Sequence, residues 1–166
     1  MTGLRLIIAL PTGRTLIIET WFQALRANDD FDLTEITDYG AVSEDGYSLL
    51  QTAIASRPRY AVNLVALGAR IDHQDHKGQT ALQYAISRGY ADIARALIRA
   101  GADVKLVDAY GNGPLWTAVM QPKPDLEIIK LIFDRGGDPH QVNAAGRSPL
   151  SMAITKNDED ILAIIG

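Results

Sequence analysis

The chain has 166 residues, 47% of them hydrophobic, and a net charge of −4 from 16 Lys and Arg against 20 Asp and Glu. This length and apolar content predict one domain with its own core, and the lack of a basic block argues against nucleic acid as a partner, because phosphate backbones are bound by clustered cations. The sequence contains no Cys, which excludes disulfides, thiolate nucleophiles and Cys-ligated zinc and favours a reducing compartment such as the cytoplasm.

The N-terminal segment carries two apolar stretches, at residues 4–10 and 15–20, on either side of a Pro-Thr-Gly-Arg turn. This pattern predicts a short β-hairpin, with a disordered leader as the alternative. The run at 6–10 is too short for a signal peptide and lacks a small-residue cleavage site, so we do not expect secretion. No stretch approaches the roughly 20 apolar residues of a membrane helix, and we expect no membrane partner. We assign residues 1–18 to this leader or hairpin and 19–166 to the domain that follows.

The chain then repeats itself with a period close to 33 residues. Gly46, Gly78, Gly111 and Gly146 lie 32, 33 and 35 residues apart. Each is followed by Ser, Thr or Gly two residues later, by Leu four residues later and by Ala seven residues later. Such repetition predicts a stack of small units, each of which contacts only its neighbours.

The residues after each of these glycines predict the start of a helix. Ser48 to Gln51 and Thr80 to Gln83 are capping boxes, in which the hydroxyl and the Gln side chain satisfy unpaired backbone donors. Pro114 and Pro149 occupy the first helical position in the other two units, where the missing N–H of proline is harmless. In all four units a helix is therefore predicted to start two or three residues after the glycine.

A second helix is predicted after the first in each unit. In the unit around Gly78, residues 82–86 carry the apolar stripe of the first helix and residues 93–98 that of the second. Gly68, Gly101 and Gly136 follow the second helices, where a left-handed C-cap is needed. The period therefore corresponds to two antiparallel helices and a protruding loop.

These features resemble the ankyrin repeat, and the resemblance is strongest in GQTALQYAISRGYADIARALIRAGADVKLVDAYGNGPLW, residues 78–116. The family pattern is D-x-x-G-x-T-P-L-H-x-A-A, a short break, an apolar helix and G-A-D-V. The resemblance implies an all-α solenoid of about five stacked helix-turn-helix units with protruding loops. The units are assigned to residues 20–42, which resemble a degenerate capping repeat with Trp21 in the position of Leu82, and to residues 43–74, 75–107, 108–142 and 143–166.

The sequence departs from the family pattern at several positions. The His of T-P-L-H is replaced by Gln51, Gln83, Trp116 and Ser151, and the Thr is replaced by Gly113 in one unit. The usual hydrogen bonding between repeats is therefore in doubt at Gly113. We expect Trp116 to pack between repeats, because the His that it replaces is usually half-buried.

Two further departures concern the second helices. Residues 121–125 add two residues between the helices of the unit 108–142, and Pro124, Asp125 and Glu127 predict the start of the next helix. The second helix of the last unit is expected to be short, with residues 158–160 keeping that end polar, as a terminal repeat requires.

The stretch IDHQDHKGQT, residues 71–80, raises the possibility of a metal site because His73 and His76 lie close together beside two Asp residues. Both histidines map to a protruding loop, and His140 is expected on the order of 20 Å away, two repeats along the stack. Zinc needs three or four converging ligands, so we read the stretch as the tip of a binding loop. The sequence also lacks a nucleophile elbow, a phosphate loop and a Cys nucleophile, and we expect no catalytic residue, metal or cofactor.

The resemblance implies that another protein is bound on the concave face formed by the loops and the exposed side of the first helices. Tyr47, Tyr84 and Tyr110 rank first because exposed aromatic residues with a polar tip are typical interface contacts, with packing between repeats as the alternative for each. Arg95, Arg99 and Lys130 are expected on a solvated outer face. The predicted partner-binding residues are Glu44, Asp45, Tyr47, Thr52, His76, Lys77, Gln79, Tyr84, Arg88, Tyr110, Asn112, Thr117, Met120, Arg147, Met152 and Lys156.

The predicted function is that of a non-enzymatic, monomeric, cytoplasmic protein-binding module. The variant YGNGPLWTAV, residues 110–119, resembles small bacterial ankyrin proteins, some of which neutralise a toxin as immunity proteins. Inhibition of a toxin is therefore the narrower hypothesis. A scaffold or adaptor in a multiprotein complex is the alternative, followed by a metal-binding or enzymatic protein. If His76 contacts a carboxylate of the partner, binding should depend on pH between about 5.5 and 7.5.

Overall fold

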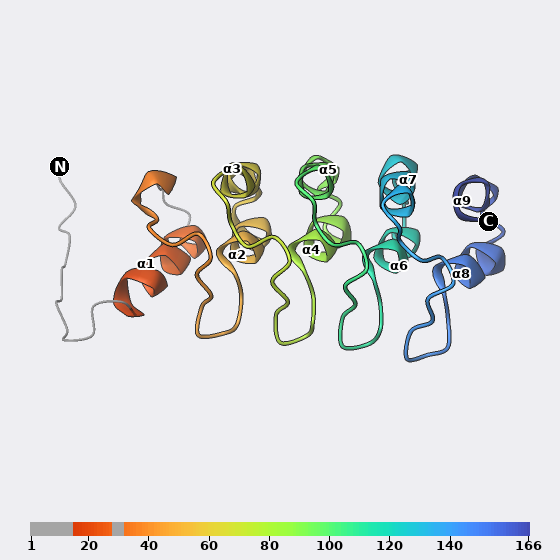
Figure 1. Cartoon of the computed structure of the whole chain (residues 1–166), viewed down its shortest axis with the longest axis horizontal. Coiled ribbons are helices and arrows are strands. Elements are labelled where there is room, and N and C mark those ends of the chain that lie inside the picture. The colour runs from red at the N-terminus through yellow and green to blue at the C-terminus, as the bar shows by residue number, and fades with distance from the viewer. Residues whose placement is uncertain (1–14, 28–31) are drawn as a thin grey trace.

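The computed structural model describes residues 15–27 and 32–166, which form a row of stacked helix pairs (Figure 1). The second helices form one tier, the first helices the next, and the loops project from the far side of the first helices. The predicted all-α solenoid is confirmed. The elements are α1 (Thr15–Arg26), η1 (Leu33–Glu35), α2 (Leu49–Ser56), η2 (Pro58–Tyr60), α3 (Ala61–Ala66), α4 (Ala81–Ser87), α5 (Ala91–Arg99), α6 (Pro114–Val119), α7 (Leu126–Asp134), α8 (Pro149–Lys156) and α9 (Glu159–Ile165).

The first helices begin where the sequence predicts. Ser48 and Thr80 each accept a hydrogen bond from the backbone N–H three residues later, and the Gln at that position accepts one from the backbone N–H of the capping residue. Pro114 and Pro149 open α6 and α8. Ser148 also forms a capping box with Ser151, which was not among the predicted boxes. Each such cap contributes about 1 kcal/mol to helix stability.

The core runs along the whole stack between the two tiers of helices. Leu82, Ala85 and Ile86 of α4 are buried, as are Ile93, Ala94, Leu97 and Ile98 of α5, so both predicted stripes are confirmed. The helix α4 packs against α2 on one side and α6 on the other, and α5 packs against α3 and α7. Gly68, Gly101 and Gly136 have φ values of +86°, +94° and +90° after the second helices, so the predicted left-handed caps are also confirmed.

The N-terminal hairpin prediction is wrong for residues 15–20, because they form the first half of α1. The other arm of that hairpin, residues 4–10, lies outside the described residues. Ile18, Trp21, Phe22 and Leu25 have the i, i+3, i+4, i+7 spacing of a helix face. The last three of these are buried, and α1 packs against α2. This helix crosses the boundary predicted at residue 19, and the short turn η1 takes the place of a second helix.

The second helices near the C-terminus start at aspartate caps. Asp125 accepts hydrogen bonds from the backbone N–H groups of Glu127 and Ile128 at 3.0 and 3.1 Å, and Asp158 accepts one from Ile161 at 3.1 Å. The helix α9 packs against α7 and α8. In the part of the chain that the structure describes, no helix has the length and apolar content to cross a membrane.

Candidate functional site

Each protruding loop is closed by one side chain at an equivalent position. Asp75 accepts hydrogen bonds from the backbone N–H groups of Lys77 and Gln79 at 2.8 and 3.0 Å, and Asp108 and Asn143 make the same pair of bonds in the next two loops. Asp75 is only 8% exposed. The sequence places it in the loop tip, but its side chain fixes the conformation of the loop from inside.

Neighbouring loops are joined to one another through their backbones. The Ala109 N–H donates to the Lys77 carbonyl at 2.8 Å, and the Ala144 N–H donates to the Tyr110 carbonyl at 2.8 Å. Side chains add to these bonds, since the Asn143 amide donates to the Asn112 side-chain oxygen at 2.9 Å. The three loop tips at residues 75–79, 108–112 and 143–147 therefore form one continuous ridge.

The two adjacent histidines face the first loop. His73 Nε2 lies 2.8 Å from the Gly46 carbonyl oxygen, and a Cβ added to Gly46 would lie 2.5 Å from the ring of His76. The glycine thus leaves room for the exposed His76 side chain between loops. Within residues 15–27 and 32–166, no group of three or more His, Cys, Asp or Glu residues is arranged to hold a metal.

The two Gln residues that replace the family His carry the contact between repeats. The side-chain amide of Gln51 donates to the backbone carbonyl of Gln79 at 2.6 Å, and that of Gln83 donates to the backbone carbonyl of Asn112 at 2.7 Å. Both Gln side chains are buried. In the next unit Trp116 stands at this position and is half-buried, so the unit that contains Gly113 has no amide there, and packing of the ring between repeats stays a prediction.

Several predicted partner-binding residues converge on a hollow over α2 and α4. The hollow has a volume of about 230 Å³ and is lined by Tyr47, Thr52, Tyr84 and Arg88 from the predicted set. Arg26, at the end of α1, also lines it. Arg26 is absent from the predicted set, which contains no residue of the degenerate first unit, residues 20–42. The structure therefore brings two tyrosines and two arginines together on the side of the first helices.

Tyr84 is held in a fixed orientation at this hollow. Its hydroxyl donates to Asp75 Oδ2 at 2.8 Å, so the residue that closes the loop also positions the ring. Burial, together with the hydrogen bond to Asp75, raises the pKa of Tyr84 above its usual range. The hydroxyl therefore keeps donating to Asp75 at pH values where an ordinary tyrosine loses its proton. Because this bond holds the ring, the ring loses little freedom when a partner binds.

Cations on both faces of the solenoid form ion pairs within the chain. On the outer face, Arg95 lies 2.8 Å from both Asp92 and Glu127, and the hydrogen bond to Asp92 raises the pKa of Arg95. Lys130 lies 2.9 Å from Asp134. At the hollow, Arg26 lies 3.4 Å from Asp45, whereas Arg88 is exposed and pairs with no carboxylate of the described residues. A partner can therefore pair with Arg88 without first breaking an internal ion pair.

The remaining predicted residues differ in how accessible they are. Thr52 is only 5% exposed, because α1 and α4 flank α2 and bury all residues from Leu49 to Ile54. It is open to a partner only through the hollow that it lines, and its role as a contact stays a prediction. Tyr110 is the opposite case, at 64% exposed on its loop tip. The exposed members of the set are Glu44, Asp45, His76, Lys77, Arg88, Tyr110, Met120, Arg147 and Lys156, and the half-buried ones are Tyr47, Gln79, Tyr84, Asn112, Thr117 and Met152.

Comparison with known proteins gives a consistent result along the stack. The family model for ankyrin repeats, in three copies, matches residues 50–143. The mouse ankyrin repeat domain-containing protein 63 is 31% identical over 121 residues, which cover 69% of this chain and 31% of that protein. An intracellular phospholipase A2 of Caenorhabditis elegans is 31% identical over 107 residues, which cover 61% of this chain and 10% of that protein. An ankyrin repeat-containing protein of Treponema pallidum is 32% identical over 107 residues, which cover 64% of this chain and 35% of that protein.

Proposed function

The chain belongs to the ankyrin-repeat family, whose repeats are protein-protein interaction modules, and on this basis we propose that it binds a partner protein across its first helices and loop tips. It spans about a third or less of the relatives described above. The match to the phospholipase covers a tenth of that enzyme and gives no reason to assign its activity here. The proposed function is therefore binding without catalysis.

The observation that carries this proposal is the hollow between Tyr47 and Tyr84, with Arg26 and Arg88 at its edge. Tyrosine and arginine dominate the binding energy of protein interfaces, and truncation of such a residue typically costs about 2 kcal/mol or more. The fixed orientation of Tyr84 and the unpaired Arg88 both reduce what the partner must reorganise. We propose that an acidic segment of the partner lies over this hollow and that Tyr110 contacts it from the loop ridge.

The test is affinity purification of the chain from its native cell with mass spectrometry, followed by binding measurements on purified variants. Arg88→Ala and Tyr110→Ala suit this test because both side chains are exposed, so the fold should be preserved. We expect each to weaken binding at least tenfold. The matched controls are Arg99→Ala and Lys130→Ala, which remove exposed cations from the outer face. Equal affinity for all four variants would refute the proposed face.

A narrower proposal is that the partner is a toxin and the chain acts as its immunity protein. It is supported by the resemblance of residues 110–119 to small bacterial ankyrin proteins, and the relative from Treponema pallidum is itself bacterial. Titration of the purified partner with the chain should then abolish the toxic activity at one equivalent. Several partners of modest affinity with unchanged activities would instead identify a scaffold or adaptor. We also propose a cytoplasmic location, which the Cys-free sequence favours, and a monomeric state.

A further inference from the structure

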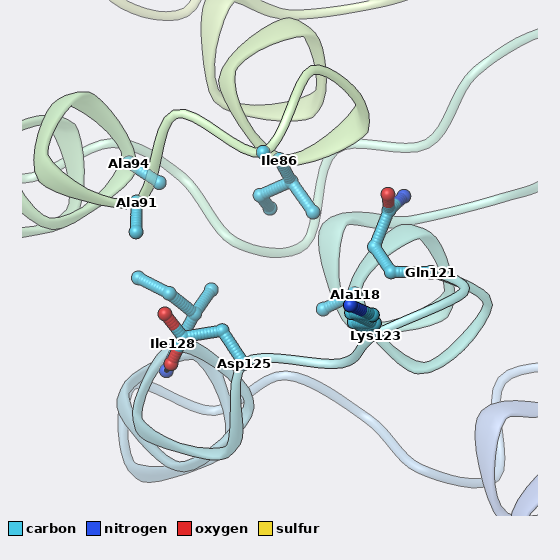
Figure 2. A pocket seen from close by; sticks show the side chains of 9 residues that line it. Ile86, Ala91, Ala94, Ala118, Gln121, Lys123, Asp125 and Ile128 are labelled. Atoms are coloured by element: carbon cyan, nitrogen blue, oxygen red, sulfur yellow. Dashed lines mark hydrogen bonds between the residues drawn. The ribbon is translucent and has the colours of Figure 1, made fainter.

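A second hollow lies between the units 75–107 and 108–142, where α6 connects to α7 (Figure 2). Its volume is about 180 Å³. Its walls are mostly apolar and include Ile86, Ala91, Ala94, Ala118 and Ile128. Figure 2 shows that these side chains come from α4, α5, α6 and α7 and surround a common space. We call this space the connection pocket. None of its lining residues belongs to the predicted partner-binding set.

The connection pocket coincides with a change in the repeat. The residues immediately before α3 and α5 are Tyr60 and Tyr90, and both pack against the core. Asp125 stands at the equivalent position before α7 and lines the pocket instead. The connection is also longer here, since it runs from Met120 to Asp125 between α6 and α7 but only from Arg88 to Tyr90 between α4 and α5. The connection pocket therefore lies where the connection is longer and no aromatic ring is present, whereas at the preceding connection Tyr90 and Pro58 themselves line a hollow of about 400 Å³.

The polar groups around the pocket are mostly engaged within the chain. The Asp125 carboxylate caps α7 and lies 3.7 Å from Arg95, and the Gln121 amide donates to the Thr117 carbonyl at 3.0 Å. Lys123 is exposed at the rim. An occupant therefore meets an apolar interior and one cation, a setting that suits an aromatic ring, because cations bind the faces of such rings.

We propose that the connection pocket binds an aromatic side chain of a partner protein, in the position that Tyr90 occupies from within the chain in the preceding unit. This inference rests on the proposed binding function, but it concerns a different hollow, which shares no lining residue with the first-helix hollow. An aromatic side chain buries about 150–250 Å² at a contact of this kind, enough to add substantially to affinity. The partner thus contacts the solenoid at two places.

The direct test uses p-cresol, the side-chain analogue of tyrosine, and NMR of the methyl groups of Ile86 and Ile128 in the full chain. We expect saturable shifts of these methyl signals at millimolar p-cresol. Ala91→Leu places a larger side chain in the pocket from a half-buried position and should weaken p-cresol binding at least tenfold. The matched control is Ala100→Leu at the end of the same helix, an exposed position outside the pocket, which should bind p-cresol like the wild type.

Three outcomes would overturn the proposal. One is the absence of shifts at Ile86 and Ile128, or equal shifts in Ala91→Leu and the wild type when both are folded by circular dichroism. Another is equal affinity for 4-methylcyclohexanol, which would show an apolar cavity without aromatic preference. The third is partner binding by Ala91→Leu that equals that of Ala100→Leu. Failure of the proposed function itself would be seen separately, in unchanged partner binding by Arg88→Ala and Tyr110→Ala.

Discussion

Replacement of Gln83 by Leu should destabilise the junction between the units 75–107 and 108–142. The Gln83 side chain donates to the Asn112 carbonyl at 2.7 Å and accepts from the Thr80 N–H at 3.0 Å, and it is 1% exposed. Loss of the bond to Asn112 costs about 1 kcal/mol, and an unpaired buried N–H at Thr80 costs about 1–3 kcal/mol. The greater burial of apolar Leu offsets about 1 kcal/mol of this loss.

The expected net loss is therefore about 2 kcal/mol of unfolding free energy. In urea unfolding followed by circular dichroism, with a slope of about 2 kcal/mol per molar urea, the midpoint should fall by about 1 M. The matched control is Gln83→His, because a neutral imidazole also offers one donor and one acceptor and the ankyrin pattern has His at this position. This variant should lose less than about 1 kcal/mol. A Leu variant as stable as the His variant would refute the idea that the buried amide connects the two units.

Three further predictions concern the first-helix hollow and the loop ridge. Arg88→Glu should weaken partner binding more than tenfold in calorimetry, whereas Arg99→Glu on the outer face should have no effect. The pKa of Tyr84 is raised above its usual value of 10.0, so the contribution of its protonated hydroxyl to stability is fully present below about pH 10 and is lost as pH rises through the folded-state pKa. Between about pH 9 and 11, the unfolding free energy measured in urea should therefore fall less for Tyr84→Phe than for the wild type. An equal fall in both proteins would contradict this. Gly78 and Gly89 have φ values of +73° and +71°, but a Cβ at Gly78 would meet the backbone of the next loop at 3.0 Å while one at Gly89 would meet nothing within 4 Å. Gly78→Ala should therefore lower the melting temperature more than Gly89→Ala, which loses only about 1–2 kcal/mol for its left-handed conformation. Equal losses would exclude a steric role for the loop contact.

The repeat architecture could be predicted from the sequence because it is periodic and local. Gly46, Gly78, Gly111 and Gly146 each mark a loop with positive φ, and the helix starts follow them at a constant distance. A signal that occurs four times outweighs the ambiguity of any single helix or turn. The same periodicity places Tyr47 and Tyr84, at two different positions of the repeat, on the side of the first helices, and both line one hollow.

The features that could not be predicted depend on contacts across units or on segments outside the period. Residues 15–20 are compatible with a strand or a helix, and only packing of α1 on α2 selects the helix. Thr52 has the register of a surface position, but α1 covers its helix. Asp75 matches the Asp of the family pattern D-x-x-G, so its role in closing the loop could have been predicted from the sequence. The neighbouring histidines instead drew attention to a possible metal site.

The loops and the helix connections lie on opposite sides of the stack, and they differ in which mutations they tolerate during evolution. The loop ridge is joined by backbone bonds such as that from Ala109 to Lys77, so a single inserted residue there would shift the pairing of two neighbouring units at once. The connection from Met120 to Asp125 is three residues longer than that from Arg88 to Tyr90, while the adjacent helices α6 and α7 keep their packing. New surface can therefore be acquired by lengthening the helix connections, whereas the loops are free to vary in side chain but not in length. Diversified libraries built on this chain should randomise residues at the loop tips and insert residues only at the connections.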